Sequence, residues 1–330
     1  MPGGNRRFIE SIQVLRAFAA FTIVLFHSGV VSFRIPFAVD LFFVISGFLM
    51  MYTSEERPRA FLFRRVLRMG PLYWLVTLLT YCILLFFPSL SLMSEARPDY
   101  LVKSLLFIPF TSPKGGDFPL VSVGWTVNYE IIFSVLFLVS FSISLRYRGL
   151  VAALLSVAGC GASLTALGGN FYFAYCFNDV ILDFVLGIAA FYAVRFVDGR
   201  RVSAWVRWSC GAALAPLLYL LFAEPVAAVC PFRVVAAGLP CLLLFLCFYV
   251  FSGDFKYDRR LVTIGDMSYS VYLVEYFTTA AFKLVPHESV ALRLFAFAAM
   301  VFATYAVSYF SWKWIEKDFT RLVSSRVLGR

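Results

Sequence analysis

Charge is scarce in this 330-residue chain, since only 15% of its residues are Asp, Glu, Lys or Arg. Soluble globular domains have about 25%. Hydrophobic residues make up 61% of the sequence. Because a water-soluble domain needs a charged exterior, this composition excludes that class and favours an integral membrane protein.

Histidine is rare in this chain, and the sequence motifs of several common catalytic folds are absent. The chain has two histidines, His27 and His287, with no ligand-like spacing, so we expect no metal site. Its seven cysteines form no CxxC pair and are interpreted as small packing residues. There is no GxSxG elbow, Walker loop, HExxH or Gly-rich dinucleotide turn. Any histidine-dependent chemistry therefore falls to His27, because His287 lies in a short predicted loop.

Apolar stretches near the roughly 20 residues needed to cross hydrocarbon recur along the whole chain. The sequence predicts an all-α, polytopic membrane helix bundle that forms one domain over residues 1–330. The first stretch follows basic residues, as in a signal peptide, but no small-residue cleavage pattern comes after it, so we expect it to remain. The ten predicted spans are 10–31, 37–54, 70–88, 124–145, 149–168, 174–194, 205–222, 233–252, 263–284 and 290–312.

The basic residues predict the orientation of these spans. If the N-terminus is cytoplasmic, 21 of the 29 Lys and Arg residues lie in inner gaps and 7 in outer gaps. By the positive-inside rule, both termini are then cytoplasmic. The net charge of +10 comes mostly from these cytoplasmic basic residues and does not indicate nucleic-acid binding.

Two gaps are long enough to hold structure of their own. In the inner gap we expect a short helix after Pro58, with a bend at Pro71 into the third span. In the outer gap, 89–123, the segment YLVKSLLFIPF is too short to span and is predicted to be a re-entrant or interfacial helix.

Arg16 and His27 are unexpected in the first span, because inserting an arginine near the centre of a membrane helix costs roughly 2.5–3.5 kcal/mol. A partner or a function must offset this cost. Their spacing of eleven residues places both on one helix face, about 16 Å apart along the axis. Asp40 and Glu130 are predicted to lie at about the depth of His27. A histidine beside a carboxylate can act as an oriented base. The alternative for His27 is an interfacial histidine bonded to a carbonyl.

Five arginines fall within residues 57–68, more than orientation requires. Arg64, Arg65 and Arg68 are spaced to share one short helix. Arginines bind phosphates through bidentate, charge-assisted hydrogen bonds, so a polyphosphate ligand from the cytoplasm is one interpretation. The other is that these arginines only mark a cytoplasmic loop.

Other acids in the spans are predicted to be mainly structural, pairing with arginines so that no charge is left alone in lipid. Asp179 and Asp183 lie at i and i+4 on one face of the sixth span, and Asp266 lies in the ninth. Glu275 is left undecided between a structural and a functional role.

Seven stretches, spread in order over almost the whole chain, resemble the acyltransferase 3 family of membrane proteins. Within that family they are most similar to exopolysaccharide O-acetyltransferases of the succinoglycan type. The Arg-x10-His pairing, FFVISGF and RRxxR make a specific combination. The stretches are SIQVLRAFAAFTIVLFH, VDLFFVISGFLM, FLFRRVLRMGPLYWL, SLLFIPF, GWTVNYEIIFSVLF, IGDMSYSVYL and WIEKDF.

The resemblance implies ten core helices, acetyl-CoA or another acyl-CoA as cytoplasmic donor, and a sugar hydroxyl on a polysaccharide precursor as acceptor. By motif position, His27 is the catalytic histidine and Arg16 its partner, while Arg64, Arg65 and Arg68 contact the coenzyme A phosphates. Glu130 matches the family's acid after the tryptophan motif. The family often has histidine where this chain has Glu275, which leaves a shared role there in doubt.

The expected partners are acyl-CoA, a carbohydrate acceptor that can be lipid-linked, and membrane lipid, in the bacterial cytoplasmic (inner) membrane. A homo-oligomer is left open. A competing hypothesis is a transporter or flippase of lipid-linked sugar, but that class favours inverted repeats and broken helices at matching positions, and none is evident. A purely structural subunit leaves the positions of His27 and the arginines unexplained.

Overall fold

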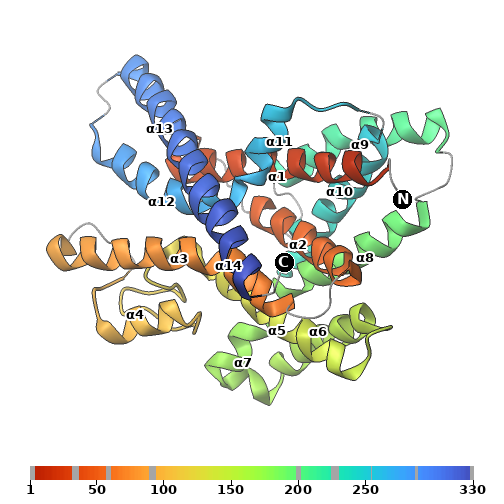
Figure 1. Ribbon diagram of the computed structural model, residues 1–330, viewed down its shortest axis with the longest axis horizontal. Coiled ribbons are helices and arrows are strands. Elements are labelled where there is room, and N and C mark those ends of the chain that lie inside the picture. The colour runs from red at the N-terminus through yellow and green to blue at the C-terminus, as the bar shows by residue number, and fades with distance from the viewer. Residues whose placement is uncertain are drawn as a thin grey trace. The chain divides into compact units, whose positions relative to one another are not determined.

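The computed structural model describes residues 4–31, 37–56, 61–88, 94–197, 202–223, 230–253, 255–286 and 289–327. Every regular element within these ranges is a helix (Figure 1). Eight helical stretches in the described part of the chain are long and apolar enough to cross a membrane. The prediction of an all-α, multi-pass membrane protein is therefore confirmed.

Eight of the ten predicted spans coincide with these eight stretches in the described ranges. The predicted span 149–168 coincides with a shorter helix, α6 (Arg148–Ser163). The predicted span 263–284 is divided at Met267 into α11 (Arg259–Asp266) and α12 (Ser268–Leu284). The number of spans and the side of each terminus remain predictions.

The chain forms two compact units, each assembled from separate parts of the sequence. Unit 1 comprises residues 1–59 and 136–268, and unit 2 comprises 60–135 and 269–330. Besides α6 and α11, unit 1 contains α1 (Gly4–Ser28), α2 (Phe37–Glu56), η3 (Ala166–Gly169), α7 (Phe171–Cys176), α8 (Ile181–Val197), α9 (Ala204–Ala223), η4 (Val234–Gly238) and α10 (Leu239–Ser252). Unit 2 contains α3 (Phe61–Phe86), α4 (Pro98–Leu105), η2 (Ser122–Gly124), the start of α5 (Trp125–Ile143), nearly all of α12, α13 (Val290–Ser311), η5 (Trp312–Phe319) and α14 (Thr320–Val327). The single-domain organisation stays a prediction.

In unit 1, helices α2 and α8 lie side by side and touch backbone to backbone (Figure 1). A Cβ added at Gly47 would lie 2.1 Å from the carbonyl oxygen of Phe184, and one at Gly187 would lie 2.2 Å from that of Val44. Small residues let membrane helices approach this closely. The two glycines therefore set the distance between α2 and α8.

We expect Gly187→Ala to lower the free energy of unfolding by about 1–3 kcal/mol, because the added methyl group forces α8 away from α2. Unfolding of the detergent-solubilised protein by increasing SDS measures this. Gly161→Ala is the matched control, since a Cβ at that helical glycine meets nothing within 4 Å. An alanine there should stabilise α6 slightly. Equal destabilisation by both variants would contradict the close-contact explanation.

In unit 2, α3 begins at Phe61 and continues through Pro71. The predicted helix after Pro58 is therefore present and is continuous with the third span, whereas the bend at Pro71 stays a prediction. Proline has no N–H to donate to the carbonyl four residues earlier, which is that of Leu67. The Thr320 hydroxyl donates to this oxygen at 3.3 Å. Satisfying the freed carbonyl in this way makes a proline tolerable inside a membrane helix.

The outer gap folds back against the middle and end of α3. Phe107, which follows α4, has a positive φ of 58°, and its ring stacks on that of Tyr73 with centroids 5.2 Å apart. Trp74 Nε1 donates to the carbonyl of Leu105 at 2.9 Å. Hence the predicted re-entrant or interfacial segment packs against a membrane helix. Its buried cluster consists of Leu84, Tyr100, Phe110 and Leu120.

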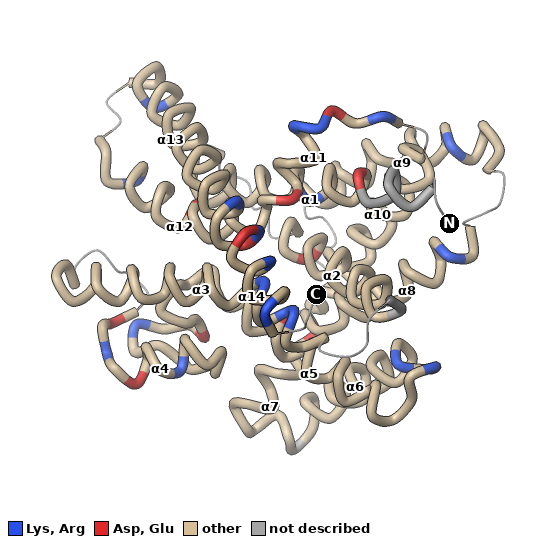
Figure 2. The backbone as a smooth tube through the Cα atoms, viewed as in Figure 1, with Lys and Arg blue, Asp and Glu red and all other residues tan. Residues whose placement is uncertain are grey.

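Figure 2 shows mostly uncharged helix centres, with Lys, Arg, Asp and Glu gathered near helix ends and in connections. At the start of α4, Arg97 Nε donates to Asp99 Oδ1 at 3.0 Å. This hydrogen bond lowers the pKa of the Asp99 carboxyl and raises that of Arg97. Both side chains are exposed, so the pair contributes little to stability.

Candidate active site

Arg16 and His27 share α1, which is unbroken from Gly4 to Ser28. Their eleven-residue spacing therefore places them on one face. Arg16 is 7% exposed, and its Nη1 donates to Gln13 Oε1 at 3.1 Å. The half-buried His27 lies in the last turn of α1, with its ring centroid 5.4 Å from that of Phe26. Unit 1 thus holds a guanidinium and an imidazole in one helix whose surroundings are largely apolar.

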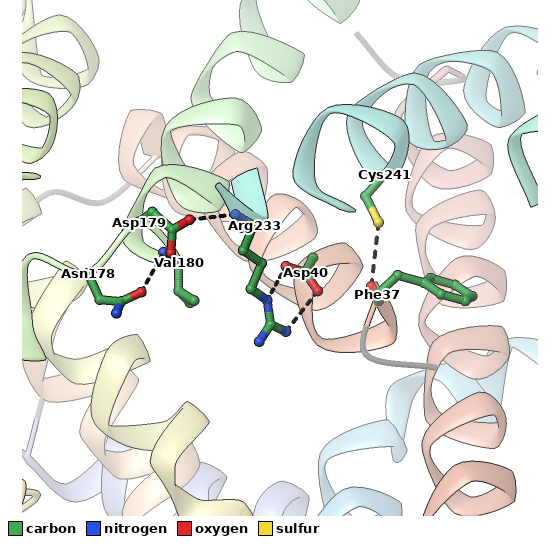
Figure 3. A network of polar contacts seen from close by, with 7 residues as sticks. All are labelled: Phe37, Asp40, Asn178, Asp179, Val180, Arg233 and Cys241. Atoms are coloured by element: carbon green, nitrogen blue, oxygen red, sulfur yellow. Dashed lines mark hydrogen bonds and ion pairs between the residues drawn. The ribbon is translucent and has the colours of Figure 1, made fainter. Parts of the chain in front are cut away.

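Asp40, in the first turn of α2, is fully buried and bound by Arg233. Arg233 Nε donates to Asp40 Oδ1 at 2.7 Å, and Nη2 donates to Oδ2 at 2.9 Å. The Arg233 backbone N–H donates to Asp179 Oδ2 at 2.6 Å (Figure 3). Asp40 therefore has a bidentate arginine partner, although its oxygens keep further acceptor capacity. Its predicted role in orienting His27 stays a prediction.

Asp183, in the first turn of α8, is a further buried acid of unit 1. Its carboxylate is fully buried, and neither oxygen has a hydrogen-bond partner among the described residues. A Cβ added at Gly238 would lie 2.2 Å from Asp183 Oδ1, so η4 passes directly against this carboxylate. The predicted structural role of Asp179 agrees with its contact to Arg233, although the contact is made by the backbone of the arginine.

In unit 2, Arg64, Arg65 and Arg68 lie in the first turns of α3. Arg65 forms an ion pair with Glu130 of α5, and these side chains are 15% and 17% exposed. Arg64 is half-buried and Arg68 is exposed. The pair joins two residues for which the sequence predicted different roles. Arg57 and Arg59, the other members of the arginine run, lie outside the described residues.

The ion pair shows where Glu130 lies along α3. A Cβ at Gly124 would lie 2.7 Å from the Tyr73 ring, whereas Glu130 contacts Arg65. From Gly124 to Glu130, the contacts on α3 move from Tyr73 back to Arg65, so the two helices run antiparallel here. The segment between α3 and α5 brings the start of α5 to the middle of α3, so Glu130 lies near the arginine end of α3. Its predicted depth, close to that of His27, stays a prediction.

Sequence reasoning missed Arg233, which it counted only as one of seven basic residues in outer gaps. Its position could have indicated a buried role. Arg233 lies directly before an apolar span, on the side of the membrane where the positive-inside rule disfavours arginine, and such an arginine needs a buried acid as its partner. The structure thus places His27, Arg16 and Asp40 in unit 1, and the three arginines and Glu130 in unit 2.

Residues 9–313 match the acyltransferase 3 family, described as an acyltransferase domain. The chain belongs to this family. It is also 31% identical over 278 residues to the exopolysaccharide production protein ExoZ of Rhizobium meliloti, a match that covers 79% of this chain and 81% of ExoZ. No solved structure matches the chain. A multi-pass membrane acyltransferase fits the buried polar groups of both units.

Proposed function

We propose that this acyltransferase moves an acyl group, most simply acetyl, from acyl-CoA to a sugar hydroxyl of an exopolysaccharide or another cell-surface glycan precursor. The observation that carries the proposal is the similarity to ExoZ, named an exopolysaccharide production protein, over four-fifths of both chains. The protein would act in the bacterial inner membrane with its arginine-rich gaps in the cytoplasm, where acyl-CoA is made.

His27 acts as general base in this proposal. It removes the proton of the sugar hydroxyl while the oxygen attacks the thioester carbonyl, which forms the C–O bond. The C–S bond then breaks, and the imidazolium returns the proton to the departing thiolate of coenzyme A. The Arg16 guanidinium, on the same helix face, would stabilise the negative charge that develops on the carbonyl oxygen.

Arg64 and Arg68 bind the phosphates of coenzyme A at the start of α3. Guanidinium groups are suited to this because they donate bidentate hydrogen bonds to phosphate. Glu130 holds Arg65 through their ion pair, and so fixes one side of this cationic surface.

Removing the charges of Arg64 and Arg68 should weaken donor binding. We expect the double variant Arg64→Ala, Arg68→Ala to raise the KM for acetyl-CoA by at least about 100-fold, because each of the two lost charge-assisted bonds contributes about 1.5–3 kcal/mol. Radiolabelled acetyl-CoA incubated with membranes, with label counted in glycan, measures this. Arg65 is left intact, so the ion pair with Glu130 survives.

Arg146→Ala is the matched control, because this exposed arginine belongs to another gap that is predicted to be cytoplasmic. It should leave the KM unchanged. If the double variant and the control behave alike, the arginines serve orientation alone and the phosphate assignment fails.

A further inference from the structure

Asn128, in the first turn of α5, carries a carboxamide whose hydrogen-bonding capacity is unused. The residue is 1% exposed. Neither its Nδ2 nor its Oδ1 has a hydrogen-bond partner among the described residues. Buried side-chain amides are normally bonded, and leaving one unbonded costs free energy. An apolar residue of similar size would avoid that cost, so the asparagine calls for an explanation.

The other polar groups near Asn128 on α5 are satisfied. The Thr126 hydroxyl donates to the carbonyl of Val123 at 3.1 Å and bonds the Tyr272 hydroxyl at 3.0 Å. The Ser134 hydroxyl donates to the carbonyl of Glu130. The Thr126 and Ser134 hydroxyls of α5 are therefore bonded within the protein, whereas the Asn128 carboxamide is bonded to none of the described residues.

Asn128 lies in the stretch where α5 runs antiparallel to α3. Gly124, one turn earlier, adjoins Tyr73, and Glu130, two residues later, pairs with Arg65. Along the α5 axis, Asn128 is about 3 Å beyond Glu130 in the direction away from the arginines. A ligand whose phosphates lie at Arg64 and Arg68 and that extends along α3 would pass the level of Asn128 along the helix axis.

We propose that Asn128 binds an amide of the pantetheine arm of acyl-CoA. A carboxamide offers one donor side and one acceptor side, which match the C=O and N–H of a secondary amide. The pantetheine arm contains such amides and connects the phosphates to the thioester. The inference rests on the proposed function, because it assigns a further contact to the same donor.

The test compares two ligands in detergent solution by isothermal titration calorimetry. Coenzyme A contains the pantetheine arm, whereas adenosine 3′,5′-bisphosphate keeps phosphates without it. We expect Asn128→Leu to raise the Kd for coenzyme A about tenfold and to leave the Kd for the bisphosphate unchanged. Without ligand, the variant should resist unfolding at least as well as the unchanged protein, since it loses an unbonded buried amide.

Asn178→Leu is the matched control, because this exposed asparagine of unit 1 should affect neither Kd. Unchanged coenzyme A affinity in Asn128→Leu would overturn the inference and leave the proposed function standing. Reduced stability with unchanged affinity would also overturn it, and would assign the amide to a buried water. If the unchanged protein binds neither ligand, the proposed donor fails and the inference fails with it.

Discussion

Replacing His27 with alanine should reduce acyl transfer by about a hundredfold to ten-thousandfold, the contribution usual for a positioned general base. Without the imidazole, no group takes the hydroxyl proton as the sugar oxygen attacks the thioester. Label transferred from acetyl-CoA to glycan measures the loss. Because His27 is assigned to chemistry and not to phosphate binding, the Kd for coenzyme A should stay close to that of the unchanged protein.

The second histidine of the chain gives the matched control for this experiment. His287→Ala should transfer label at the unchanged rate, because no step of the proposed mechanism uses that residue. Full activity in His27→Ala would refute the base assignment. Movement of a lipid-linked sugar without consumption of acetyl-CoA would favour a flippase over the proposed enzyme.

Arg233→Ala should lower the free energy of unfolding by about 3–5 kcal/mol, the effect usual when one partner of a buried ion pair is removed. Asp40 is fully buried, and its two carboxylate oxygens accept hydrogen bonds from Nε and Nη2 of this guanidinium. The variant leaves its charge uncompensated between α2 and η4. Unfolding in SDS of the detergent-solubilised protein measures the change.

Arg97→Ala is the control, because the exposed pair with Asp99 should contribute nothing measurable. Combining Asp40→Asn with Arg233→Met should recover most of the lost stability, since neither member of the pair is then left charged without its partner. Transfer activity in that double variant then tests Asp40 separately, because restored stability with lost activity supports its role beside His27. If Arg233→Ala is as stable as the unchanged protein, the ion pair is not a stabilising contact.

Much of the helix content was predictable because a membrane span is a local property of about 20 apolar residues. The positions of α1, α2, α9 and α13 follow from such runs. Details that depend on tertiary contacts were not predictable. The passage of α3 through Pro71 requires the Thr320 hydroxyl, which is 253 residues from Leu67 in the sequence. The position of the start of α5 depends on how the segment between α3 and α5 folds back on α3, which hydropathy does not define.

The candidate residues were recognisable by type, whereas their pairing was not. A buried arginine or acid attracts notice because it is costly in an apolar run. Its partner lies far away in sequence, as with Arg65 and Glu130, which are 65 residues apart. Asn128 gave no such signal, because an uncharged side chain in an apolar run is common, and only the packed interior shows that its amide is unbonded.

The 193 residues that separate Asp40 from Arg233 have a consequence for biosynthesis. At about 5–20 residues per second, the ribosome needs roughly 10–40 s to supply the arginine after the aspartate has been made. During that interval α2 is in the nascent chain with an acid that has no guanidinium to bind. We therefore expect α2 to stay near the insertion machinery until η4 emerges.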